Sequence, residues 1–290
     1  MNKKKQNPED RSQNPVGGNH RSENGRNESS GSWLLNSEFL EIDIALSRAV
    51  LYSALALGFR PPAEETIARL CSEDGATALA DAAALLDPRR ESGLAAACLR
   101  LTAHFSLLAA TASHRRLFGH TARGGVPPYE TEYGAEALFQ QPQELGDLNG
   151  FYHAFGLALN QAEHERADHV SCECEFLAFL ALKEAYALEH TDTAMLEETR
   201  KAERLFLRDH LAHFFPAFAN KLARDDRDGF YHVLGELGRG LVARECARWN
   251  LPLGPGSLSL RPATDDRVPM ACGGESCPAM PGASESDETD

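Results

Sequence analysis

Apolar residues recur every three or four positions through the middle of the chain, which is the spacing of one face of an α-helix. This pattern marks seven segments, around residues 37–50, 61–70, 87–108, 147–159, 168–190, 193–214 and 228–249. No segment shows the sustained period-two alternation that is expected of a half-buried strand. The pattern therefore predicts an all-α protein, built as a single helical-bundle domain.

Polar side chains that can accept a hydrogen bond from a first helical turn precede four of these segments. The predicted N-caps are Ser37, Asp87, Asp147 and Asp168. Pro61-Pro62 and Pro88 fit such helix starts, because a proline in the first turn removes no intrahelical hydrogen bond. Pro216, by contrast, is expected to interrupt the helix around 193–214.

The two ends of the chain lack the helical pattern. Residues 1–30 are rich in Asn, Ser, Gly and Arg, whereas residues 251–290 are rich in Pro, Gly, Ser and Asp and carry a net charge of −5. Such segments cannot bury enough apolar surface to offset the entropy that is lost on ordering. We therefore expect a disordered tail over 1–30, an all-helical domain over 31–250, and a flexible acidic tail over 251–290 that contains Cys272 and Cys277.

The charge of the chain limits the partners that it can bind. The net charge is −14 overall and −11 within residues 31–250, which disfavours binding of nucleic acid or acidic lipid and suits a basic partner. No run of 18 apolar residues and no apolar signal-peptide core occurs, so we expect neither a transmembrane helix nor export. The seven cysteines are an odd number and lie mostly in helical segments, which is typical of reduced thiols in the cytoplasm.

One segment resembles a metal-binding motif. His164 and Glu165 begin like the helical His-Glu-x-x-His zinc site, but Asp168 stands where the second histidine would be. Because zinc also accepts carboxylates, a metal-dependent hydrolase that uses His164, Glu165 and Asp168 is the alternative function. His210 and His213 share one helical face, and both metal binding and burial with a backbone partner are compatible with that spacing.

The remaining motifs carry no catalytic signature. Phosphate-binding loops and Gly-x-Ser-x-Gly are missing from the sequence, so we expect no catalytic residue, no metal and no cofactor. Cys172 and Cys174 point to different faces of a helix and are expected to pack in the core. Cys272 and Cys277 are separated by a Gly-rich stretch. Their role stays open: they could form a redox pair, share a metal site with a partner, or have no role.

Two further segments concentrate aromatic and acidic residues. Tyr129, Glu130 and Tyr133 lie in a loop that two prolines stiffen, a combination suited to peptide binding because tyrosine loses little side-chain entropy. Packing of both tyrosines against the bundle is the other interpretation of this loop. Asp168 and His169 stand at a helix start, where they form either part of a site or an N-cap.

Three short motifs in a shared order resemble the TorD-like family of redox-enzyme maturation chaperones. They are Pro-Pro-Tyr-Glu-Thr-Glu-Tyr at 127–133, Glu165-x-x-Asp168-His169, and Glu-Cys-Glu-Phe-Leu-Ala-Phe-Leu at 173–180. Residues 52–62 and 206–211 are similar to further parts of this family, so the resemblance extends over about residues 38–250. The family often has proline before the Asp-His pair, and Ala167 departs from that pattern.

The resemblance implies an all-helical cytoplasmic chaperone that has no enzymatic activity. Such a chaperone binds the twin-arginine signal peptide and the apo-form of a molybdopterin-containing oxidoreductase subunit, delays its export and assists cofactor insertion. The peptide- and client-binding residues that the resemblance implies are Tyr129, Glu130, Tyr133, Glu165, Asp168 and His169. The sequence leaves open the identity of the client, the choice between monomer and domain-swapped dimer, and the binding of a guanine nucleotide, which is suggested for some relatives.

The physical properties of such a ligand agree with this composition. A twin-arginine peptide carries guanidinium groups followed by an apolar run. Guanidinium pairs with carboxylate through parallel hydrogen bonds, so an acceptor needs acidic side chains beside an apolar groove. A negatively charged helical bundle can supply both.

Overall fold

The computed structural model describes residues 29–102, 106–119, 123–134, 140–160 and 165–262. Within these ranges the chain forms ten α-helices and one 3-10 helix, and the only β-pairing is three isolated bridges. The elements are α1 (Ser29–Phe59), α2 (Glu64–Cys71), α3 (Glu73–Leu86), α4 (Leu94–Leu101), α5 (Leu107–Phe118), η1 (Glu130–Glu132), α6 (Gln140–Ala154), α7 (Val170–Glu189), α8 (Thr193–Asp209), α9 (Leu211–Asp225) and α10 (Phe230–Arg248). The predicted all-α fold is confirmed.

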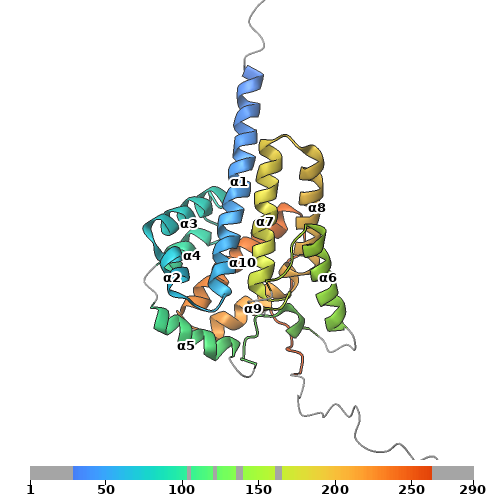
Figure 1. The fold of residues 1–290 in the computed structure, drawn as a ribbon. Helices are drawn as coiled ribbons and strands as arrows, with labels where there is room; N and C mark the ends of the chain where they lie inside the picture. The colour runs from blue at the N-terminus through green and yellow to red at the C-terminus, as the bar shows by residue number, and fades with distance from the viewer. Residues whose placement is uncertain (1–28, 103–105, 120–122, 135–139, 161–164, 263–290) are drawn as a thin grey trace, which may run out of the picture.

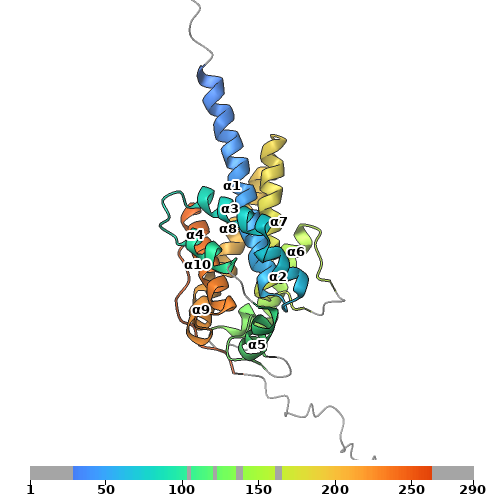
Figure 2. The ribbon, with the colours of Figure 1, turned by 90° about the vertical axis from the view of Figure 1, so that its left-hand side faces the viewer.

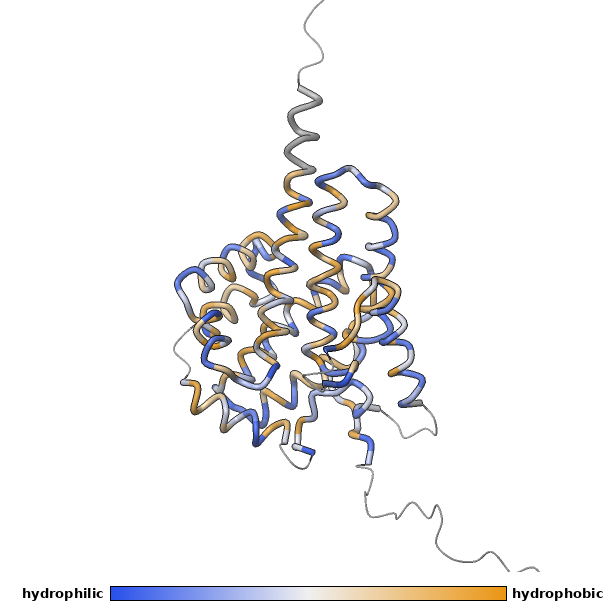
Figure 3. The backbone as a smooth tube through the Cα atoms, viewed as in Figure 1, coloured by the Kyte–Doolittle hydropathy of each residue, from blue (hydrophilic) through white to orange (hydrophobic). Residues whose placement is uncertain are grey.

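The long helices α1 and α7 lie side by side at the centre of the molecule (Figures 1 and 2). Helices α2 to α5 lie on one side of this pair, and α6 and α8 lie on the other side (Figure 1). Helix α10 packs against α9, α4 and α1 and closes the bundle. Figure 3 shows apolar stretches along α1 and α7 where they run together, and hydrophilic residues at the turn that joins α7 to α8.

Helix α1 is the most apolar of the long helices. Its part from Phe39 to Phe59 is long and apolar enough to cross a membrane by length and composition alone, yet 56% of that window is buried inside the protein. Fully buried side chains along it include Leu51, Tyr52 and Leu55, and the helix packs against α7, α3 and α10. Burial of this apolar surface is the main term that stabilises the bundle. The composition of α1 is therefore explained by its place in the core.

A buried ionic cluster joins four of these helices. Arg48 of α1 is fully buried, and its guanidinium contacts Glu184 of α7, Glu203 of α8 at 2.9 Å and Glu245 of α10 at 2.7 Å. Burial alone would lower the pKa of Arg48, but the three carboxylates outweigh it and raise this pKa. Arg48 thus stays charged in the core and is surrounded by acceptors.

Two further arginines complete this cluster from its edge. Arg248 contacts Glu184 at 2.5 Å and Glu203 at 3.1 Å, and Arg200 contacts Glu184 at 2.6 Å. Burial raises the pKa of Glu184 by itself, but the three arginines outweigh it and the net pKa of this carboxyl is lowered. The cluster therefore keeps Glu184 ionised inside the bundle.

The break between α8 and α9 lies earlier than the sequence predicts. The backbone leaves the helical conformation at His210 (φ −124°, ψ −99°), and Pro216 lies inside α9. A proline there leaves the carbonyl of residue 212 without its helical donor. The N–H of Gly254 takes that place, donating to the Ala212 carbonyl at 3.0 Å. A partner from outside the helix thus lets α9 continue through Pro216.

The donor Gly254 belongs to residues 251–262, which we call the C-terminal strap. The strap has no helix, but Gly134 N donates to the Ser259 carbonyl and Arg261 N donates to the Glu132 carbonyl, each at 2.9 Å. These residues were expected to belong to the flexible tail, but they are hydrogen-bonded to the helical domain. The contacts of that domain therefore extend beyond the predicted boundary at residue 250. The rest of the two predicted tails, residues 1–28 and 263–290 with Cys272 and Cys277, lies outside the described residues.

Several predicted helix starts differ from the structure. Helices α1 and α6 begin before Ser37 and Asp147, so neither residue is a cap. Asp87 does not start a helix; its carboxylate accepts from the N–H groups of Glu91 and Ser92 in the following turn. The segment 87–108 divides into α4 and α5, and the alanine-rich α3 is a helix that the periodicity did not mark. Helix α3 is capped by Ser72, whose hydroxyl accepts from Gly75 N at 3.0 Å.

Candidate functional site

The two segments that carry the predicted site residues lie next to each other. Tyr129 and His169 form an isolated antiparallel bridge, with Glu130 N donating to the Asp168 carbonyl at 2.9 Å and Val170 N donating to the Pro128 carbonyl at 2.8 Å. Their side chains also meet, since the rings of Tyr129 and His169 pack edge to face with centroids 5.3 Å apart. The fold thus unites residues that are about 40 positions apart in the sequence.

Asp168 joins these two segments from the inside. Its side chain is fully buried, and Oδ2 accepts from the Thr131 hydroxyl at 2.7 Å and from Thr131 N at 3.2 Å. The Arg166 guanidinium completes the arrangement with donors 2.8 and 3.0 Å from the two carboxylate oxygens. Asp168 therefore holds the loop before α6 against the start of α7 and is not the predicted N-cap.

His169 is the residue that caps α7. Its Nδ1 accepts from Ser171 N at 3.1 Å, while burial, followed by the positive charges of nearby residues, lowers its pKa to about 3. The imidazole is therefore neutral at physiological pH. Since Nδ1 is an acceptor, the ring proton resides on Nε2, which faces the Glu165 carboxylate 3.9 Å away. His169 fixes the direction of α7 and carries no charge.

Glu130 and Tyr133 also point inward. The Glu130 carboxylate lies 3.1 Å from Nδ1 of His210 at the α8–α9 junction, and burial raises its pKa. The Tyr133 hydroxyl donates to the Pro127 carbonyl at 2.9 Å, and its ring packs against Phe214. Both side chains are more than 90% buried, so they position the loop and do not contact solvent.

Of the six predicted residues, Tyr129 and Glu165 reach the surface. Tyr129 is half-buried, and the Arg166 guanidinium lies 4.4 Å from its ring centroid as a cation–π contact. Burial, and then the nearby Glu165 carboxylate, raise the pKa of Tyr129 to about 12. In this conformation Tyr129 and Glu165 can therefore contact a ligand directly. The other four side chains are buried and hold these two residues in place from the interior; they are Glu130, Tyr133, Asp168 and His169.

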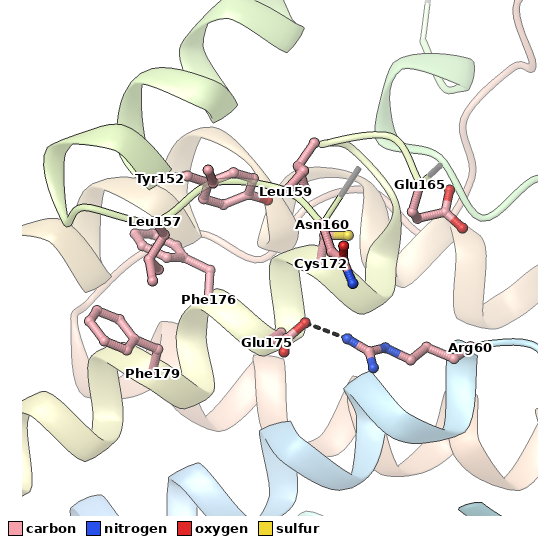
Figure 4. Close-up of a pocket in the computed structure, with 11 residues that line it drawn as sticks. Arg60, Tyr152, Leu157, Leu159, Asn160, Glu165, Cys172, Glu175, Phe176 and Phe179 are labelled. Atoms are coloured by element: carbon pink, nitrogen blue, oxygen red, sulfur yellow. Dashed lines mark hydrogen bonds and ion pairs between the residues drawn. The ribbon is translucent and has the colours of Figure 1, made fainter. Parts of the chain in front are cut away.

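A pocket of about 430 Å³ opens beside Glu165. One wall is apolar and consists of Tyr152, Leu157, Leu159, Phe176 and Phe179. Figure 4 shows the polar wall opposite, where Glu165, Glu175 and Arg60 lie around Cys172 and Asn160. The pocket forms where the end of α1, residues 157–160 and the first turns of α7 meet.

The sequence reasoning did not assign Arg60, Glu175, Phe176 or Phe179 to a site. Glu175 carried a signal, because it is one of two carboxylates in the first two turns of a helix with an apolar face, and Phe176 and Phe179 follow it. Arg60 carried none, since it lies 115 positions from Glu175 in the sequence. The pocket could not be assembled without the packing of α1 on α7.

The chemistry of the pocket favours binding over catalysis. Burial raises the pKa of the Cys172 thiol to about 12, so Cys172 is protonated and a poor nucleophile or metal ligand at neutral pH. Within the described ranges, no group of three or more His, Cys, Asp or Glu is arranged to hold a metal ion. His164, the first residue of the predicted zinc-like motif, lies outside those ranges. An apolar wall beside acidic side chains suits a cationic, partly apolar ligand.

Comparison with known proteins relates this arrangement to one class of proteins. The family described as nitrate reductase delta subunit matches residues 74–220. A TorD chaperone protein of Vibrio cholerae serotype O1 is 30% identical over 203 residues, which cover 68% of this chain and 90% of the relative.

Two other relatives match over shorter stretches. A TorD chaperone protein of Photobacterium profundum is 30% identical over 115 residues, covering 40% of this chain and 52% of the relative. A chlorate reductase assembly chaperone protein of Ideonella dechloratans is 44% identical over 78 residues, covering 27% of this chain and 39% of the relative. The chain thus spans about half or less of these two relatives.

Proposed function

This chain belongs to the nitrate reductase delta subunit family, which includes TorD-like redox-enzyme chaperones, and we propose that it binds a twin-arginine signal peptide. In this proposal the peptide belongs to a molybdopterin-containing oxidoreductase subunit, which the chaperone also holds in its apo-form. Binding takes place in the cytoplasm, where it delays export and assists cofactor insertion. The relatives are named as chaperones and not as enzymes, and no hydrolase activity is proposed.

The single observation that carries this proposal is the pocket beside Glu165. It combines an apolar wall with two carboxylates, Glu165 and Glu175, which is what an arginine followed by an apolar run requires. Phe176 and Phe179 give the apolar part of the peptide a rigid aromatic surface. The net charge of −11 over residues 31–250 also speeds the encounter with a basic peptide.

We assign the six predicted residues two different roles in this function. Tyr129 and Glu165 contact the peptide, Tyr129 through its ring and Glu165 through its carboxylate. Glu130, Tyr133, Asp168 and His169 position these two residues from the interior, because their side chains are buried. A change in one of the four interior residues would therefore act on binding through the shape of the loop.

The proposal is tested by calorimetric titration of the full chain with a twin-arginine signal peptide and with the same peptide carrying Lys-Lys in place of Arg-Arg. We expect the Arg-Arg peptide to bind more tightly, since lysine cannot form the two parallel hydrogen bonds to a carboxylate. Glu165→Gln should raise the Kd of the Arg-Arg peptide about tenfold, which corresponds to the loss of one charged hydrogen bond of about 1.4 kcal/mol.

Glu198→Gln is the matched control, because it removes the same charge from an exposed site on α8. It should leave the Kd nearly unchanged. Equal, weak binding of the Arg-Arg and Lys-Lys peptides would contradict the proposed function, and so would an equal loss of affinity in the two variants.

A further inference from the structure

An ion pair spans the polar side of the pocket. The Arg60 guanidinium donates from Nη2 to Oε2 of Glu175 at 2.7 Å (Figure 4). Both side chains line the pocket, and they come from different parts of the chain, Arg60 from the position directly after α1 and Glu175 from the second turn of α7. The Glu175 carboxylate, which could bind an arginine of the peptide, therefore already has a guanidinium partner in this chain.

The geometry of this pair is that of a weak, replaceable contact. The side chains of Arg60 and Glu175 are 35% and 60% exposed, and one hydrogen bond joins them where a guanidinium and a carboxylate can form two. Exposed pairs of this kind contribute little to stability, because water screens them and both side chains lose freedom. The pair differs in this respect from the ionic cluster around Arg48, which is enclosed by the core.

The position of Arg60 keeps its side chain close to the pocket. It follows Phe59, the fully buried last residue of α1, and precedes Pro61-Pro62. The anchored phenylalanine and the stiff prolines hold the backbone on either side. The long arginine side chain can still turn away into solvent, because its head group is partly exposed.

We propose that Arg60 competes with an arginine of the bound peptide for the Glu175 carboxylate, an inference that rests on the proposed function. A peptide guanidinium can replace the Arg60 guanidinium at nearly equal energy, because the same type of contact forms as is lost. A purely apolar segment would leave Glu175 without a new partner if it displaced Arg60. Arg60 thus lowers the affinity for every ligand that has to displace it, and a ligand that carries arginine differs from an apolar one in restoring the lost contact at Glu175.

The test uses the full chain with Arg60→Gln and titration with the Arg-Arg peptide. Loss of the competitor should lower the Kd about two- to fivefold, the range expected when an exposed ion pair no longer has to be broken. Arg208→Gln is the matched control, since Arg208 is an exposed arginine of α8 whose partner is the neighbouring Asp209. It changes the net charge by the same amount and should leave the Kd nearly unchanged.

Glu175→Gln separates competition from a general effect of charge. In the Glu175→Gln background, Arg60→Gln should no longer tighten binding, because there is no carboxylate to compete for. If Arg60 acted only through its charge, the same tightening would appear in both backgrounds, and the proposal would be overturned. The proposal on Arg60 would also be overturned by a second result. In that result the wild-type chain prefers the Arg-Arg peptide to the Lys-Lys peptide, but Arg60→Gln weakens binding of the Arg-Arg peptide or leaves it unchanged.

The two proposals fail in distinguishable ways. If the wild-type chain binds neither peptide or both equally, the proposed function fails and the role of Arg60 fails with it. If the wild-type preference for arginine is present and the Arg60 variants behave otherwise than expected, the role of Arg60 alone is wrong.

Discussion

Neighbouring residues at the start of α7 have different roles because each meets a different environment. Asp168 accepts hydrogen bonds from two donors of Thr131 and from the Arg166 guanidinium, so both of its carboxylate oxygens have partners inside the protein. His169 caps the helix as a neutral ring. Glu173, four residues further on, is fully buried, and neither of its oxygens has a hydrogen-bond partner among the described residues. Burial of the Glu173 carboxyl therefore lowers the stability of the folded state.

The cost of burying Glu173 should be visible as a pH dependence. Burial, and then the charges of Glu130 and Asp168, raise the pKa of Glu173 well above its ordinary value of 4.5. The folded state keeps this carboxyl protonated while the unfolded state ionises it, so stability falls as the pH rises above about 4.5. In Glu173→Gln this loss is absent, and its stability relative to wild type should grow by up to about 1.4 kcal/mol per pH unit until the folded-state pKa is reached.

Urea unfolding of wild type and Glu173→Gln between pH 5 and pH 8 measures this difference. Glu198→Gln, on an exposed part of α8, should follow the wild-type pH dependence. Parallel curves for wild type and Glu173→Gln would mean that the carboxyl is ionised in the folded protein.

At the scale of elements, segments distant in the sequence complete one another. Helix α9 tolerates Pro216 because Gly254 of the C-terminal strap donates to the Ala212 carbonyl. The approach is so close that a Cβ on residue 254 would lie 2.2 Å from the His213 carbonyl oxygen. Only glycine can therefore occupy this position without moving the strap. The strap in turn hydrogen-bonds to Glu132 and Gly134, next to the candidate site.

Gly254→Ala should displace the strap and lower the free energy of unfolding by about 1–3 kcal/mol, since backbone atoms must move to admit the methyl group. Thermal unfolding measures the loss, and faster proteolytic cleavage within 251–262 would report the displaced strap. Gly256→Ala is the control in the same segment, because its Cβ would meet only the Asn220 side-chain amide, which can shift at the cost of one exposed hydrogen bond to the Gly256 carbonyl while the backbone stays in place. Equal effects of both changes would show that the close contact at Gly254 does not hold the strap.

At the scale of the whole molecule, one buried arginine joins the central helices. Arg48 contacts carboxylates from α7, α8 and α10, so the cluster forms only when all four helices are in place. Burial raises the pKa of Glu203 even with these partners, which indicates how strongly the site depends on positive charge. The same packing of α1 on α7 brings Arg60 to Glu175 and forms the pocket.

Arg48→Met should lower the free energy of unfolding by about 3–5 kcal/mol, because three buried carboxylates lose their central cation. The deficit should shrink as the pH is lowered, since protonated carboxyls no longer need a positive partner. Chemical denaturation at pH 7 and pH 5 measures both effects. Arg100→Met, which removes a partly exposed partner of Glu236, should cost less than about 1 kcal/mol. A similar small cost for Arg48→Met would show that the cluster does not stabilise the bundle.

The sequence alone determined the properties that depend on neighbours along the chain. The apolar period of three to four residues predicted the all-α fold and the approximate positions of α1, α7 and α10. The composition determined the negative charge. Helix boundaries were less well predicted: the N-caps at Ser37, Asp87, Asp147 and Asp168 were wrong, because a side chain that can cap a helix can also lie inside a helix, bond to a turn or make a tertiary contact.

Only the tertiary structure decided which of the predicted site residues face solvent. Tyr129 and Tyr133 lie in one loop and look alike in sequence, yet one is half-exposed and the other is buried against Phe214. The pocket likewise depends on Arg60 and Glu175, which are 115 positions apart. Such contacts form because packing the apolar faces of α1 and α7 brings distant residues together, and local periodicity carries no information about which faces will meet.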